Sequence, residues 1–115
     1  MANTFKVITK AGVIGLDDIY TVAASTTTVI LGVVLGNTTT SQTTATVTLS
    51  SDTANRAGNN NEANQDVELI TNAPIPAGSS LELLAGNKVV MEATDVFKVS
   101  AANATDVTLS IMEIT

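Results

Sequence analysis

Apolar and polar residues alternate along most of this chain with a period of two, which is typical of strands rather than helices. The clearest case is the segment 43–49, where Ala45, Val47 and Leu49 alternate with threonines. Because successive side chains of a strand point to opposite faces, we expect these three residues inside and the threonines outside. The same pattern, interrupted by turn signals, predicts eight or nine strands, at 4–9, 17–22, 26–35, 43–49, 66–71, 80–84, 88–92, 96–101 and 107–114.

One segment departs from this alternation. Residues 29–35 form a nearly continuous apolar run. A strand of this kind is typically buried on both faces. We therefore expect the core to cover one side of it, and a partner or a second layer of the same domain to cover the other.

Composition agrees with an all-β fold. Threonine makes up about a sixth of the chain, and its β-branched side chain suits a pleated sheet better than a helix. A length of 115 residues is sufficient for one core. We predict one domain over residues 1–115, an antiparallel β-sandwich of jelly-roll or Greek-key type. Within it, residues 1–10 form a first strand or an extended arm, and residues 51–65 form a long surface loop.

Charge and composition argue against several functions. Five Lys and Arg residues against eleven Asp and Glu give a net charge of −6, which disfavours nucleic-acid binding. The chain has no cysteine and no histidine, the residues most used for thiol chemistry, metal binding and general-base catalysis. We therefore expect that the protein is not an enzyme, that it has no catalytic residue, and that it binds no metal ion and no cofactor. The longest apolar stretch is far shorter than the ~20 residues that span a bilayer.

Individual polar motifs do not change this expectation. Asp17 and Asp18 are neighbours, so in a strand they would point to opposite faces rather than share a proton or a metal ion. The serines have no histidine to activate them, and the Asn37 and Asn103 sequons read as turns. The 51–65 loop has oxygen ligands but not the spacing of a calcium loop, and we expect it to be exposed to solvent. Its polar residues are Asp52, Asn55, Arg56, Asn59, Asn60, Asn61 and Glu62.

The sequence features that remain concern contacts between the protein surface and other proteins. A small β-domain with few charges and an apolar run at 29–35 must cover its exposed edges and faces, and copies packed about a symmetry axis would do so. The opening segment is also suited to lie across a partner. We expect partner contacts from Asn3, Thr4, Phe5, Lys6, Val7 and Ile8, and a homo-oligomer.

Nearly the whole chain resembles a known class of proteins. The resemblance lies in the opening segment 1–13, in 19–32, in the Pro-rich segment 72–83, in 88–95 and in the ending 107–115. These segments resemble small virion structural proteins of tailed bacteriophages, especially phages of marine bacteria and cyanobacteria. The resemblance implies a capsid decoration (cement) protein, which binds the major capsid protein as an oligomer, with a trimer favoured. It also implies location in the virion, after assembly in the host cytoplasm.

Two other classes stay open. One is a neck, tail or fibre component, or a receptor- or glycan-binding module of the virion, although the chain has only three aromatic rings for stacking on sugars. The other is a jelly-roll hydrolase or isomerase, a class that usually relies on histidine clusters to bind a metal. The number of copies per particle separates decoration proteins from neck, tail and fibre components.

Overall fold

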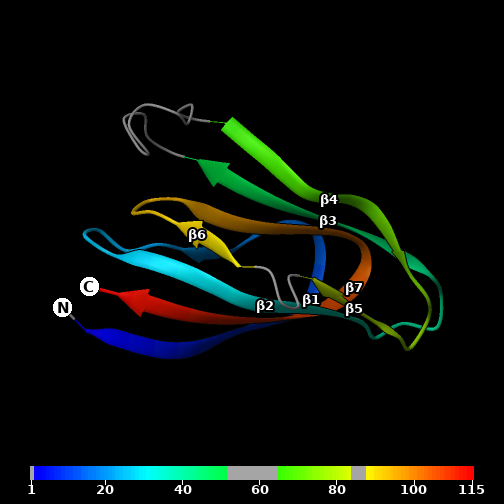
Figure 1. The fold of residues 1–115 in the computed structure, drawn as a ribbon. Helices are drawn as coiled ribbons and strands as arrows, with labels where there is room; N and C mark the ends of the chain where they lie inside the picture. The colour runs from blue at the N-terminus through cyan, green and yellow to red at the C-terminus, as the bar shows by residue number, and fades with distance from the viewer. Residues whose placement is uncertain (1, 52–64, 84–87) are drawn as a thin grey trace.

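The computed structural model describes residues 2–51, 65–83 and 88–115, and within them it contains strands and no helix. The sequence-based prediction of an all-β, sandwich-like fold is confirmed (Figure 1). The seven strands of this part of the chain are β1 (Asn3–Thr21), β2 (Thr27–Asn37), β3 (Thr43–Ser51), β4 (Gln65–Ile75), β5 (Ser80–Leu83), β6 (Val89–Met91) and β7 (Val96–Ile114).

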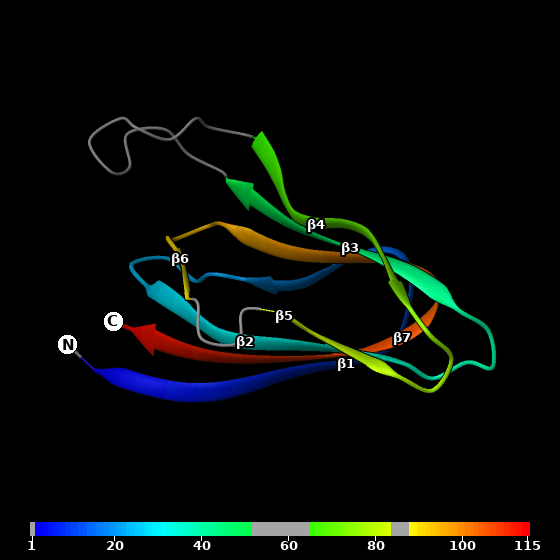
Figure 2. The same cartoon turned by 45° about the vertical axis from the view of Figure 1, so that its right-hand side comes forward.

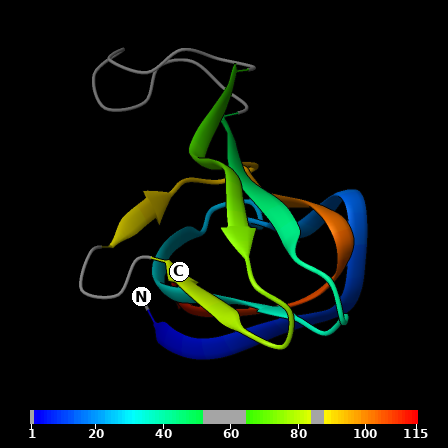
Figure 3. The same cartoon turned by 90° about the vertical axis from the view of Figure 1, so that its right-hand side faces the viewer.

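Two long strands, β1 and β7, hold the molecule together. They pair antiparallel along almost their whole lengths, from Asn3 opposite Ile114 to Thr21 opposite Val96. Both strands bend, so that each contributes to two layers (Figures 1 and 3). The second half of β7 lies between β1 and β2, while its first half lies between β1 and β3.

We call these layers A and B. Layer A contains the first half of β1, the second half of β7, and β2, with β5 and β6 both paired to β2. Layer B contains the second half of β1, the first half of β7, and β3 and β4. Figure 2 shows the two layers one above the other, with the N- and C-termini together at one end of layer A. There the backbones of Ala2 and Thr115 exchange two hydrogen bonds of 3.0 and 3.1 Å.

Bulges in β1 allow the chain to cross from layer A to layer B without leaving the sheet. The pairing register shifts between Lys10 and Gly15, where Gly12 and Gly15 both adopt left-handed backbone conformations (φ 66° and 73°). Only glycine does this without strain, and bulged strands are how sheets turn corners. The amide of Gly12 also donates to Asp106 Oδ1 on β7, at 2.9 Å.

This bend accounts for the difference in strand number. The sequence predicts separate strands at 4–9 and 17–22, and again at 96–101 and 107–114 with a turn at 103–106. The structure joins each pair into one continuous strand, so two of the eight predicted interruptions between strands are wrong. Of the two alternatives for residues 1–10, residues 3–10 form the first half of β1 and pair with β7. They therefore belong to the sheet and not to a free arm.

The core lies between the two layers. The inward-facing positions predicted on the last strand, Val107, Leu109 and Ile111, are fully buried, as are Ala45 and Val47 on β3. Burial of such apolar surface contributes roughly 25 cal/mol per Å² and is the main stabilising term of the fold. The largest buried side chains are Phe97, Ile30, Leu35, Ile75, Met91, Leu109 and Ile111.

Asn37 ties the end of β2 to two turns. Its side chain is 3% exposed; Nδ2 donates to the carbonyl oxygens of Ser41 (2.8 Å) and Ile75 (3.0 Å), and Oδ1 accepts from the amide of Thr39 (2.9 Å). From the sequence, this residue is predicted only to form part of a turn. In the structure it is a buried anchor that links the β2–β3 and β4–β5 connections.

Several predictions fall on residues 52–64. Asp52, Asn55, Arg56, Asn59, Asn60, Asn61 and Glu62 lie outside the described residues. Their predicted exposure to solvent therefore stays a prediction. In the described ranges, no helix is long and apolar enough to cross a membrane.

Candidate interaction surface

The outer side of layer A carries four of the seven large apolar side chains that are exposed in the described chain, Phe5, Val7, Val34 and Val90. Strand register identifies its members, because residues paired in an antiparallel sheet point to the same face. They are Asn3, Phe5, Val7 and Thr9 on β1; Ile114, Met112, Ser110 and Thr108 on β7; and Thr27, Val29, Gly32 and Val34 on β2. We refer to these residues as the A face.

One row of the A face is apolar across β1, β7 and β2, and it continues onto β6. Phe5 on β1 pairs with Met112 on β7, which pairs with Val29 on β2, which pairs with Val90 on β6. The two outer members are the most exposed, Phe5 at 72% and Val90 at 58%, while Met112 and Val29 are half-buried. Val7, at 61%, lies beside this row. Large exposed apolar surfaces of this kind are typical of sites that contact other proteins.

A hollow interrupts the A face next to this row. It has a volume of about 300 Å³ and lies over Gly32, with Leu31 and Val34 on β2, Glu82 on β5, and Thr108 and Ser110 on β7 around it. Gly32 has no side chain, and nothing lies within 4 Å of the position that a Cβ atom would take there. A one-residue bulge at Leu31 shifts the register between β2 and β7 at this point. The A face therefore combines one protruding aromatic ring with one hollow.

None of the twelve residues of the A face is charged, but two exposed acidic residues lie on the same side at its margin: Glu82, which pairs with Val34, and Asp106, which pairs with Gly36. On the same strands, Lys6, Lys10 and Glu113 occupy the opposite parity and face the space between the layers. The cores of protein–protein interfaces are likewise depleted of charge and enriched in aromatic residues and methionine. The A face thus has the composition of an interface core.

The predicted contact residues divide between two faces. Asn3, Phe5 and Val7 belong to the A face, whereas Thr4, Lys6 and Ile8 have the inward parity, with Lys6 opposite buried Ile111 and Ile8 opposite buried Leu109. A partner on the A face can therefore contact only half of the predicted set directly. The sequence alone does not show that Met112, Val29, Gly32 and Val34 belong to the same surface. The period-two alternation on 107–114 contains the signal for Met112.

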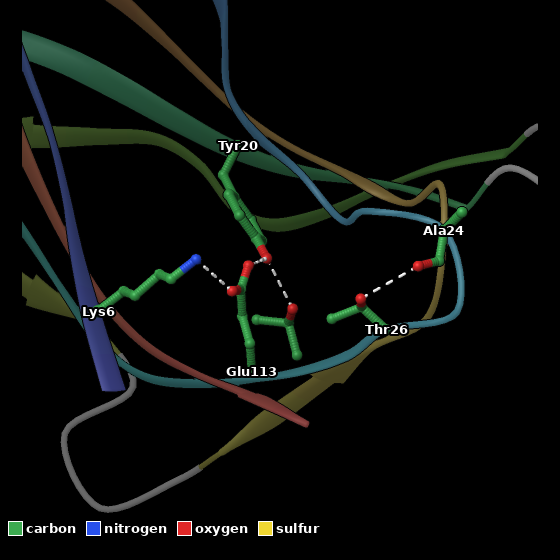
Figure 4. Close-up of polar contacts among 6 residues, drawn as sticks. Lys6, Tyr20, Ala24, Thr26 and Glu113 are labelled. Atoms are coloured by element: carbon green, nitrogen blue, oxygen red, sulfur yellow. Dashed lines mark hydrogen bonds and ion pairs between the residues drawn. The ribbon is translucent and has the colours of Figure 1, made fainter. Parts of the chain in front are cut away.

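The inward side of the β1 edge is polar. Lys6 Nζ lies 2.6 Å from Glu113 Oε1, and Lys10 Nζ lies 3.3 Å from Asp17 Oδ2. Tyr20, from the layer-B half of β1, reaches layer A and donates to Glu113 Oε2 at 2.6 Å; its hydroxyl also lies 2.8 Å from Thr28 Oγ1 (Figure 4). We call Lys6, Tyr20, Thr28 and Glu113 the clasp, because they join the two layers at this edge.

The clasp changes the acidity of two groups. The hydrogen bonds from Lys6 and Tyr20 hold the pKa of the Glu113 carboxyl below its ordinary value. Burial, together with the hydrogen bond to Glu113, raises the pKa of Tyr20 to about 12. At neutral pH the tyrosine is therefore a proton donor and the glutamate a charged acceptor.

Bulges and inward-pointing charges are two devices by which natural sheets keep their edges from pairing with other chains. The edge strand β1 has three register shifts, at 10–13, 13–15 and 18–20, and two inward-pointing lysines. Its edge is thus protected against extension of the sheet by another strand. Contact with a partner is favoured through the A face.

A second hollow, of about 380 Å³, lies on the outer face of layer B. Leu16, Thr46, Thr48, Asp66, Glu68, Lys98 and Ser100 surround it. It mixes both signs of charge with hydroxyl groups, and the part of the chain that the structure describes contains no group of three or more acidic residues able to hold a metal ion. We assign no ligand to it.

No known protein family matches this sequence, and no curated protein is similar to it. Two solved structures have partial similarity of fold. One is a pilus protein of Bacillus endospore appendages, described as disulfide-linked pili; it is 16% identical, with a TM-score of 0.47 over 96% of this chain and 85% of that chain. The other is the IBDV viral particle, 14% identical, with a TM-score of 0.26 over 96% of this chain and 35% of that chain. The present chain has no cysteine and so cannot form disulfide links.

Proposed function

We propose that this protein is a structural subunit of a virus particle that decorates the capsid of a tailed bacteriophage. On this proposal it binds the major capsid protein on the outside of the head and stabilises the assembled shell. The resemblance of residues 1–13, 72–83 and 107–115 to phage virion proteins supports the assignment.

The observation that carries the proposal is the uncharged, partly apolar A face. A chain with a net charge of −6 has no charged residue among the twelve of this surface, with Glu82 and Asp106 only at its margin, and exposes a phenyl ring there. Exposed apolar surface is unfavourable for an isolated protein but is stabilising when other protein covers it. A subunit of a particle has such cover permanently.

Decoration requires many weak contacts rather than one strong one. Copies that are held side by side on a lattice are present at high effective concentration, so modest affinity at each contact gives firm overall attachment. The acidic remainder of the surface keeps the free protein in solution before assembly.

Two measurements test this function. The first is quantitative mass spectrometry of purified virions, for which we expect hundreds of copies per particle; about a dozen or fewer would indicate a neck, tail or fibre component. The second is co-sedimentation of the purified protein with capsids that lack it, with capsids already carrying it as the control. If the protein fails to bind the capsids that lack it, the proposal is contradicted.

A further inference from the structure

The A face carries a protruding group and a hollow of matching size on the same surface. Phe5 is 72% exposed and extends from β1, while the hollow over Gly32 lies two strands away on β2. A cavity of about 150 Å³ is large enough to hold benzene. The hollow, at about 300 Å³, therefore has room for a phenyl ring.

We infer that the A face binds the A face of a second copy of this chain, with Phe5 of each copy in the hollow over Gly32 of the other. When two identical surfaces meet about a two-fold axis, each contact between a group and a hollow is made twice. An axis in the plane of contact, midway between Phe5 and Gly32, satisfies both contacts at once. Because the protruding group and the hollow lie on one face, this arrangement is complete with two copies.

Charge also favours a second copy as the occupant. Each chain has a net charge of −6, so two copies repel one another wherever charged surfaces approach. The twelve positions of the A face carry no ionised side chain, and the two acidic residues on this side lie at its margin, Glu82 at the rim of the hollow and Asp106 beyond Thr108. Along the row of Phe5, Met112 and Val29 a partner recognised by charge would find nothing to pair with, whereas a second copy presents the same uncharged groups there.

The size of the face sets the strength of the contact. The surface is about 20 Å long, measured along the strands from Asn3 to Thr9, and about 19 Å wide over four strands. Its area is therefore roughly 400 Å² per copy, without the additional area of protruding side chains. The pair buries roughly 800 Å², below the 1,200–2,000 Å² of stable complexes and in the range of transient ones. We therefore expect a weak dimer in solution, which forms more completely where copies are concentrated on a particle.

Sedimentation equilibrium of the full chain, from micromolar to millimolar concentration, measures this association directly. We expect a monomer–dimer equilibrium. Phe5→Ala should weaken it at least about tenfold, as truncation of an aromatic anchor does. Gly32→Val should weaken it similarly by filling the hollow. Neither change should unfold the chain, because Phe5 is exposed and the space at Gly32 is open.

Val67→Ala is the matched control, since Val67 is an exposed apolar residue on β4 of layer B, outside the A face. It should leave the association constant unchanged. Urea unfolding of each variant shows that the fold is retained. A wild-type chain that is monomeric throughout, a trimer, or variants that dimerise as the wild type does would each overturn the inference.

This inference names the partner of the surface on which the proposed function depends, but it is measured on the isolated protein. A dimer that does not bind capsids would contradict the proposed function alone. A monomer that binds capsids would contradict the dimer alone.

Discussion

Tyr20 and Glu113, 93 positions apart in the sequence, share a hydrogen bond of 2.6 Å that connects the two layers of the sheet (Figure 4). Tyr20 lies on the part of β1 in layer B, and Glu113 lies near the end of β7 in layer A. Glu113 also pairs with Lys6 on the other half of β1. One carboxylate therefore binds both halves of the same bent strand.

Removal of the tyrosine hydroxyl tests this connection. Tyr20→Phe keeps the ring and removes the donor, so we expect it to lower the free energy of unfolding by about 1.5–3 kcal/mol, the range for hydrogen bonds to charged groups. Lys6→Met should cost less, about 1 kcal/mol or below, because half of the Lys6 side chain is exposed to solvent. Urea unfolding measures both. A double-mutant cycle of Tyr20→Phe with Glu113→Gln should give coupling; strict additivity would show that the bond contributes nothing.

The clasp also predicts how stability depends on pH. The pKa of Glu113 is lower in the folded than in the unfolded chain, so its contribution is present above the ordinary glutamate pKa and is lost as the pH falls through the folded value. The pKa of Tyr20 is raised to about 12, so its contribution is complete below its ordinary value, about 10, and is lost as the pH rises from there through the folded value. Stability should decline at both extremes.

Tyr20 is the only tyrosine of the chain, which also has no tryptophan. Its ionisation can therefore be followed by ultraviolet absorbance without interference, and we expect a folded midpoint well above that of the urea-unfolded chain. Glu113→Gln should shift this midpoint downward, because it removes the charged acceptor, and should flatten the acid limb of the stability curve. Equal midpoints in the folded and unfolded chains would contradict the hydrogen bond.

The sequence predicts the strands far better than their connections in space. Period-two alternation correctly identifies the inward positions of 107–111 and of Ala45 and Val47 because burial of one face depends only on local order. It misreads 103–106 and the region of Gly12 as breaks, since glycine, asparagine and aspartate are common both in turns and at bulges. Only pairing with distant strands distinguishes the two cases.

The candidate surface has the same limitation. The apolar run at 29–35 is predicted to be covered on both sides, and the structure confirms the inner cover: Ile30, Val33 and Leu35 are buried. The outer side, with Val34 39% exposed, has no cover within the described chain. Strand register places Phe5 in one row with Met112 and Val29. The pattern of residues along the sequence does not contain this register.

Asn37 provides a test of a polar residue in the core. Asn37→Ala removes the donor to Ile75 O and the acceptor for the Thr39 amide, and leaves these backbone groups without their partner. We expect a loss of about 2–4 kcal/mol, since unsatisfied buried groups are costly. Asn103→Ala is the matched control: among the described residues this half-buried side chain donates to Gln42 O alone, at 3.2 Å, and its loss should cost below about 1 kcal/mol. Thermal unfolding compares the two, and similar losses would argue against an anchoring role for Asn37.

The protection of the β1 edge yields the last prediction. Lys10 and Asp17 lie on inward positions on either side of the bend and form an ion pair of 3.3 Å. The double variant Lys10→Val, Asp17→Val keeps the net charge at −6 but replaces both inward-pointing charged residues with valine, which favours strands. Because an apolar edge strand is a template for pairing with other chains, we expect this variant to aggregate faster than the wild type, as measured by light scattering and thioflavin fluorescence at equal concentration. Lys10→Gln, Asp17→Asn removes the same charges without adding apolar surface and should remain soluble. If both variants aggregate alike, loss of the ion pair is the cause; if neither does, the bulges at 10–15 suffice to protect the edge.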